Sequence, residues 1–239
     1  MTNEMRTVSR RARLRAQTSR EIEEESFVII DEGGVHALSI AALARAMAMS
    51  APAVYRYFPS RDALVAHLTT QSYQQLATAM SQAVAGSRRA PRAQVGLLVA
   101  AYRDWALRHR RRYGMLFGER PGDAPGDAPG DAAARTPLDK AMSLLIDLLV
   151  ALEGDPAPTE AAGGDRTLDD QLRLWARAQE RPDTMPHIAR AAILLWTRVH
   201  GIVSLELTGV FAGQSIDVQR LIDLEIDNAV QSLGQRRCA

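Results

Sequence analysis

Apolar residues recur at helical spacing along most of this chain, in both short and long stretches. An upstream stripe begins after the capping-box pair Thr18 and Glu21 and ends at Gly33-Gly34. A shorter stretch follows, with one helix face formed by Ile40, Leu43, Ala44 and Met47. These patterns predict an all-α fold.

Residues 39–64 predict two short helices joined by a tight turn. Ser39 can cap the first helix and Ser50 the second, because a serine hydroxyl accepts hydrogen bonds from first-turn amides. Pro52 suits the first turn of the second helix, where a missing N–H costs nothing. This order is typical of a helix-turn-helix, which places one helix in the major groove of DNA.

The second short helix is expected to have an inward and an outward side. Val54 and Phe58 lie four residues apart and point inward together, whereas Tyr55, Arg56 and Tyr57 fall largely on other faces. An ordinary three-helix core with solvated tyrosines has the same spacing. Spacing alone therefore does not decide between that core and a DNA-reading helix.

Longer helices are predicted after this region. Their ranges are 60–85, 92–110, 138–152, 168–180, 186–208 and 214–233, with a short helix at 113–117. Two segments rich in glycine, 118–137 and 154–166, are expected to be loops, and the first repeats Gly-Asp-Ala-Pro. We therefore expect a flexible basic arm at 1–17, a three-helix head at 18–66 and a larger helical domain at 67–239.

Charge and composition narrow the class of protein. The 239 residues are 46% hydrophobic with a net charge of +1, so any positive surface for nucleic acid must be local. The arginine-rich arm can add phosphate or minor-groove contacts. Cys238 is the single cysteine, which excludes an internal disulfide and fits a reducing cytoplasm. Charged residues interrupt the apolar stretch 188–211, which predicts a buried helix and no membrane span.

The segment Ser50–Leu64 closely resembles the recognition-helix region of the tetracycline-repressor (TetR) family of bacterial transcriptional regulators. The matching features are Tyr55, Tyr57, Phe58, the Pro59-Ser60 turn and Arg61. Residues 196–207 resemble a C-terminal domain type of that family marked by a Trp and a His-Gly pair. The resemblance implies a homodimer in which the last two long helices of each subunit form a four-helix bundle.

The resemblance also implies a set of DNA contacts. Tyr55 and Tyr57 would touch phosphates or base edges, Arg61 would clamp a phosphate at a helix start, and hydroxyl or guanidinium groups of the first short helix would touch the backbone. Small apolar residues would face thymine methyls, and Arg56 would bond guanine or remain a solvated or phosphate-facing side chain. The full set is Ser39, Arg45, Ser50, Ala51, Pro52, Ala53, Tyr55, Arg56, Tyr57 and Arg61.

Two positions depart from the family pattern. Ala48 stands in the turn where the family usually has Gly, and a left-handed non-Gly residue costs roughly 1–2 kcal/mol, so a remodelled turn is expected. Ile40-Ala41-Ala42 stands where a polar or basic contact residue is common. This departure removes polar base contacts from the start of the first short helix.

The function that these features predict is a ligand-responsive DNA-binding regulator. It would be a repressor, released from a palindromic double-stranded operator by a small apolar effector. Residues expected to line the effector cavity are Tyr102, Trp105, Met142 and Trp175, although rings of this kind more often belong to a core or an interface. No cofactor or metal site is expected, because the histidines lack paired ligand spacing. An enzyme or a protein-binding adaptor with a vestigial head is the alternative.

Overall fold

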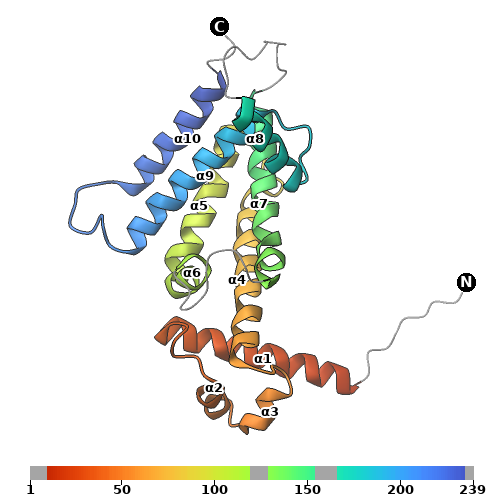
Figure 1. The fold of residues 1–239 in the computed structure, drawn as a ribbon. Helices are drawn as coiled ribbons and strands as arrows, with labels where there is room; N and C mark the ends of the chain where they lie inside the picture. Colours follow the sequence, from red (N-terminus) through yellow and green to blue (C-terminus); the bar gives the residue numbers. More distant parts are fainter. Residues whose placement is uncertain (1–9, 119–128, 154–165, 235–239) are drawn as a thin grey trace, which may run out of the picture. The chain divides into compact units, whose positions relative to one another are not determined.

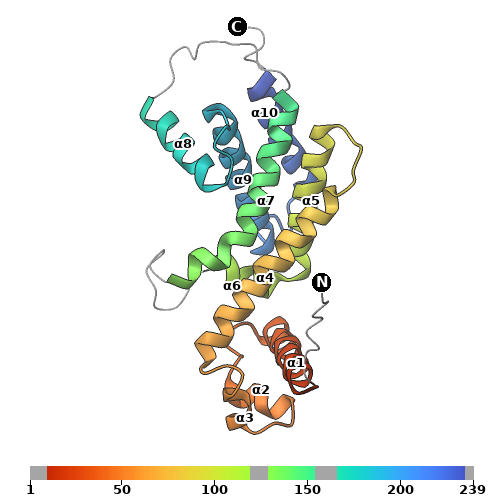
Figure 2. The same cartoon turned by 90° about the vertical axis from the view of Figure 1, so that its right-hand side faces the viewer.

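The computed structural model describes residues 10–118, 129–153 and 166–234, and the regular structure in these ranges is helical (Figures 1 and 2). The helices are α1 (Arg10–Gly33), α2 (Ile40–Ala46), α3 (Ala51–Tyr55), α4 (Arg61–Val84), α5 (Pro91–Arg108), α6 (Arg110–Phe117), α7 (Pro129–Glu153), α8 (Arg166–Ala178), α9 (Pro186–Leu207) and α10 (Val218–Gly234). The predicted all-α fold is confirmed.

The chain divides into two compact units. The first holds α1, α2, α3, α6 and the part of α4 that ends at Ser72, and the second holds α4 from Tyr73, α5, α8, α9, α10 and α7 from Arg135. The sequence predicts a division between residues 66 and 67, with the short helix α6 in the larger domain. In the structure α6 packs against α1, because Arg112 pairs with Asp31 at 2.5 Å and lies 4.0 Å from the ring centre of Phe27.

The first unit is built around one apolar core, to which each of its helices contributes. The buried members are Ile22, Phe27, Ile30, Leu38, Ile40, Leu43, Ala44, Val54, Phe58, Leu64, Leu68 and Met115. Helix α1 ends as predicted, because Gly34 adopts a φ of 79° and its N–H donates to the carbonyl of Ile30 at 2.7 Å. The chain can then turn into α2.

Helix α1 begins earlier than predicted. It starts at Arg10, so the prediction of a flexible arm is wrong for residues 10–17, while residues 1–9 lie outside the described part. Arginine, alanine, leucine and glutamine favour helices, and Gln17 donates to Glu21 at 3.0 Å one turn later. The extension is also anchored, because Arg15 donates to the carbonyl of Arg56 at 3.3 Å.

Helix α7 also begins earlier than predicted. Pro129 stands at its first position, where proline is well tolerated, so residues 129–137 are helical and not part of a loop. The alanine run 132–134 favours the helix. Residues 119–128 and 154–165 lie outside the described part, and Arg166, expected in the second loop, opens α8.

Helix α9 is the central element of the second unit. It packs against α5, α8 and α10, and Figures 1 and 2 show α9 and α10 side by side. By length and apolar composition α9 could cross a membrane, but its inward face is buried in the protein, as predicted. Arg103 of α5 holds the far end of α9 by donating to both carboxylate oxygens of Glu206, at 2.7 and 2.6 Å. This contact raises the pKa of Arg103.

The turn between α2 and α3 contains a strained residue. Ala48 has a φ of 52°, in the left-handed region that favours glycine. The next residue, Met49, donates its N–H to the carbonyl of Ala44 at 2.8 Å, so the tight turn is kept. The expected remodelling of this turn is therefore wrong, because the surrounding hydrogen bonds hold Ala48 in the unfavourable conformation.

Replacing Ala48 by glycine should stabilise the protein. The left-handed conformation costs alanine roughly 1–2 kcal/mol, and the extra flexibility of unfolded glycine offsets part of the gain, which leaves about 1 kcal/mol. Equilibrium urea unfolding followed by circular dichroism measures the change. The matched control is Ala41→Gly on the exposed side of α2, which should lower the unfolding free energy by about 1 kcal/mol. A destabilised Ala48→Gly variant would contradict the strain.

Candidate functional site

The helix-turn-helix forms as its local sequence predicts, with one difference in capping. Ser39 accepts a hydrogen bond from the N–H of Ala42 at 3.1 Å and so caps α2. Ser50 occupies the position before α3, but its hydroxyl makes no cap bond. The reason is local, because Pro52 has no N–H and the N–H of Ala53 donates to the carbonyl of Ser50 at 2.9 Å. The predicted cap by Ser50 is wrong, and its hydroxyl is not used by the helix.

Helix α3 has the two sides that its sequence predicts. Val54 is completely buried and Phe58 is 8% exposed, so both join the core of the first unit. On the other side, Tyr55 is 50% exposed and Arg56 is also exposed. Pro52 is exposed as well. An apolar anchor therefore turns a tyrosine and an arginine outward from a short helix.

The other expected contact residues differ in their accessibility. Ser50 and Arg45 are exposed, whereas Ser39, Ala51 and Ala53 are half-buried. Tyr57 is half-buried and packs against the core of the first unit. The guanidinium of Arg15 lies over its ring, 5.8 Å from the ring centre. Tyr57 is thus less available to an outside partner than Tyr55.

Arg61 has a structural role that sequence reasoning missed. Its Nε donates to the carbonyl of Leu38 at 2.7 Å, and its Nη2 donates to the carbonyl of Val35 at 2.8 Å. These bonds tie the start of α4 to the loop between α1 and α2. The prediction assigned the whole guanidinium to a phosphate, but two of its donors serve the backbone of this protein. No local sequence signal could have shown this, because the partners lie more than twenty residues earlier.

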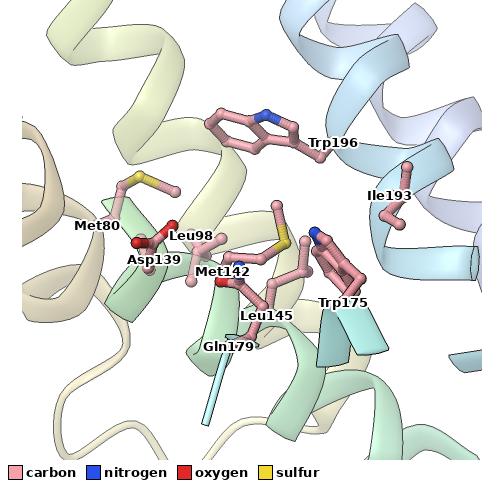
Figure 3. A pocket seen from close by; sticks show the side chains of 10 residues that line it. Met80, Leu98, Asp139, Met142, Leu145, Trp175, Gln179, Ile193 and Trp196 are labelled. Atoms are coloured by element: carbon pink, nitrogen blue, oxygen red, sulfur yellow. The ribbon is translucent and has the colours of Figure 1, made fainter. Parts of the chain in front are cut away.

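The second unit contains a cavity of about 260 Å3 (Figure 3). Its lining residues are Met80, Leu98, Asp139, Ala141, Met142, Leu145, Trp175, Gln179, Ile193 and Trp196. Of the four residues expected from the sequence, Met142 and Trp175 line this cavity. Tyr102 lines only a void of about 10 Å3 that shares several walls with it, and Trp105 is buried without lining either space.

A cluster of rings forms one wall of the cavity. Trp196 of α9, which sequence reasoning assigned to a family motif, lies across the cavity from Met142 in Figure 3. Its ring centre is 4.9 Å from that of Tyr102, in an edge-on arrangement. The Tyr102 hydroxyl lies 2.8 Å from Nδ1 of His200. Burial lowers the pKa of His200, so this ring is a neutral hydrogen-bonded core histidine, as expected.

The opposite wall is held by polar residues one turn apart on α7. Ser143 donates to the carbonyl of Gln179 at 2.7 Å. Asp147, four residues further, accepts two bonds from Arg181, both of 2.7 Å, and raises the pKa of that arginine. Asp139, four residues before Ser143, lines the cavity. The end of α8 is therefore fixed against this face of α7.

One polar atom in the cavity wall is unsatisfied. The side-chain Oε1 of Gln179 is buried and has no hydrogen-bond partner. Within the described ranges, no group of three or more His, Cys, Asp or Glu residues could hold a metal ion. The cavity is thus an apolar chamber with an acidic residue and an open acceptor in its lining.

Comparisons with known families match both units. A family model described as bacterial regulatory proteins of the tetR family matches residues 24–68, and a model described as the tetracyclin repressor-like C-terminal domain matches residues 95–229. The first covers the helix-turn-helix, and the second covers most of the cavity-lining residues. Neither description names the Trp-His-Gly type, which stays a prediction.

Individual relatives agree with these matches. The chain is 27% identical to the HTH-type transcriptional regulator Rv1816 of Mycobacterium tuberculosis over 221 residues, which cover 87% of this chain and 88% of that protein. It superposes on the crystal structure of the regulatory protein SCO4313 with a TM-score of 0.73 at 30% identity, covering 93% of this chain and 100% of that one. The TetR-family regulator PfmR from Thermus thermophilus gives a TM-score of 0.54 at 14% identity, covering 88% and 97%, and shows the fold alone.

Proposed function

Because this chain belongs to the tetR family of bacterial regulatory proteins, we propose that it is a dimeric repressor that releases its DNA operator when an effector binds. That it is a DNA-binding transcriptional regulator follows from its family. The observation that carries the proposal is the outward display of Tyr55 and Arg56 by α3. Members of the family are generally not enzymes, and the proposal includes no catalytic step and a cytoplasmic protein.

In this proposal α3 enters the major groove of a near-palindromic duplex. Arg56 bonds a guanine edge or a phosphate, and the hydroxyl of Tyr55 bonds a phosphate or a base edge. The small apolar side chains of α3 meet thymine methyls. The remaining backbone contacts come from Ser39, Arg45, Ser50 and Tyr57, with the donors of Arg61 that the protein backbone does not use.

The effector occupies the cavity of the second unit. It favours release only as far as it binds the released conformation more tightly than the DNA-bound one. Helix α4 contributes residues to both units, up to Ser72 in the first and from Tyr73 in the second. A ligand that changes the packing around Met80 of α4 therefore acts on a helix that the DNA-binding unit shares.

The dimer forms through an exposed stripe on α9 and α10. Leu194, Gly201 and Leu205 lie at i, i+7 and i+11 on α9, and both leucines are exposed, as is Leu224 of α10. A Cβ at Gly201 would meet no atom of another helix of this chain within 4 Å. Glycine in a helix costs roughly 1 kcal/mol against alanine, so a close approach by a second copy gives it a reason.

Operator binding should depend on the two exposed α3 side chains. Fragments of genomic DNA selected by the protein serve as the probe, and fluorescence anisotropy measures affinity. Arg56→Ala should weaken binding about ten- to a hundredfold, and Tyr55→Phe about two- to tenfold, as single polar contacts are lost. The control Arg88→Ala removes an exposed arginine of the second unit and should leave affinity unchanged.

Arg61→Ala separates folding from contact in the same experiment. It leaves the carbonyls of Val35 and Leu38 without their donors, so it should lower the melting temperature, whereas Tyr55→Phe and Arg56→Ala should leave melting unchanged. Parental affinity for both α3 variants would refute the proposed interface.

The dimer surface is tested by charge insertion. Leu205→Arg and Leu224→Arg each place a cation on the proposed apolar interface, so sedimentation should show monomers that keep their helical content. Leu174→Arg is the control, because Leu174 is 63% exposed on α8 and away from the α9 stripe. Variants that sediment like the parent dimer would place the interface elsewhere.

A further inference from the structure

The lining of the cavity in the second unit points to the chemistry of its ligand, and we infer that it is a small apolar amine, bound as the ammonium ion. The inference rests on the proposed function, because it names the class of effector for that cavity. The ammonium would donate to Oε1 of Gln179 and lie close to the carboxylate of Asp139, while the apolar part would contact Met142 and the two indole rings, Trp175 and Trp196.

The first argument is the open acceptor. Oε1 of Gln179 is buried without a partner, and a buried polar group that lacks its hydrogen bond costs roughly 1–3 kcal/mol. The backbone around it is fixed, since Ser143 donates to the carbonyl of Gln179 and the N–H of Gln179 donates to the carbonyl of Trp175. A ligand with a hydrogen-bond donor would remove this cost without moving the helix.

The second argument is the charge of the wall. Asp139 is the one charged residue among the described residues that line the cavity, and it is acidic. It stands one helical turn from Ser143 on α7, and Ser143 contacts the backbone of Gln179, so the carboxylate and the open acceptor belong to the same region. A cationic donor suits both groups, whereas a carboxylate ligand would meet repulsion from Asp139.

The third argument is the apolar part of the lining. Two indole rings and two thioethers, those of Met80 and Met142, surround a cavity of about 260 Å3, which is small for a ligand site. Indole faces attract cations, and thioethers adapt to apolar groups of irregular shape. The wall therefore fits a compact aromatic or alkyl group attached to an ammonium.

Three probes of matched shape test this chemistry on the full-length protein. They are 4-phenylbutylamine, 4-phenyl-1-butanol and 4-phenylbutyrate, and their binding is followed at neutral pH by tryptophan fluorescence and by calorimetry. The amine should bind about tenfold more tightly than the alcohol, because hydrogen bonds to charged groups are stronger, and the carboxylate should bind most weakly. A carboxylate or alcohol that binds as tightly as the amine overturns the inference, as does the failure of all three to bind.

Variants assign the two polar groups. Asp139→Asn should lower amine binding to the level of the alcohol, and Gln179→Leu should weaken both the amine and the alcohol about tenfold. Gln179→Glu keeps an acceptor, adds a negative charge and should strengthen amine binding, so the test does not depend on one substitution. The controls Gln171→Leu and Asp183→Asn change exposed residues and should have no effect. Unchanged selectivity in Asp139→Asn and both Gln179 variants contradicts the inference.

The same probes keep this inference separate from the proposed function. Ligand binding is measured without DNA, and operator affinity is then measured with and without saturating amine. If the amine binds as expected and operator affinity does not change, the ligand chemistry stands and the proposed release fails. If the parent binds the operator but shows no preference for the amine, the inference fails and DNA binding stands.

Discussion

The burial of Val54 and Phe58 is the constraint on which the DNA-binding surface depends. Helix α3 has only five residues, and a helix of that length is not stable in water by itself. Its direction is therefore set by its two inward side chains, which reach the core shared with α1, α2 and α4. The outward placement of Tyr55 and Arg56 follows from that packing and from no bond of their own side chains.

The second unit uses polar groups in a different way. Its helices meet through apolar faces, and hydrogen-bonded pairs such as Arg103 with Glu206 and Tyr102 with His200 join neighbouring helices. Each of these buried or half-buried groups has a partner, as buried polar groups generally do. Gln179 is the exception in the cavity wall, and an exception of this kind is more informative about a ligand than the apolar lining around it.

The sequence predicted what depends on neighbouring residues and missed what depends on distant ones. Ser39, the turn and Pro52 are local signals, so both short helices appear where they were expected. The bonds of Arg61 and the position of Trp196 in the cavity wall arise from packing between separate helices, which periodicity does not encode. The early starts of α1 and α7 were missed for another reason, because arginine-rich and repetitive segments were interpreted by composition although their alanines favour helices.

The most direct test of the account is a crystal structure of the protein with a DNA fragment that it selects from genomic DNA. The account predicts α3 in the major groove, with the hydroxyl of Tyr55 and the guanidinium of Arg56 within hydrogen-bond distance of the duplex, and Val54 still buried. A complex in which α3 faces solvent and another surface holds the DNA would contradict it.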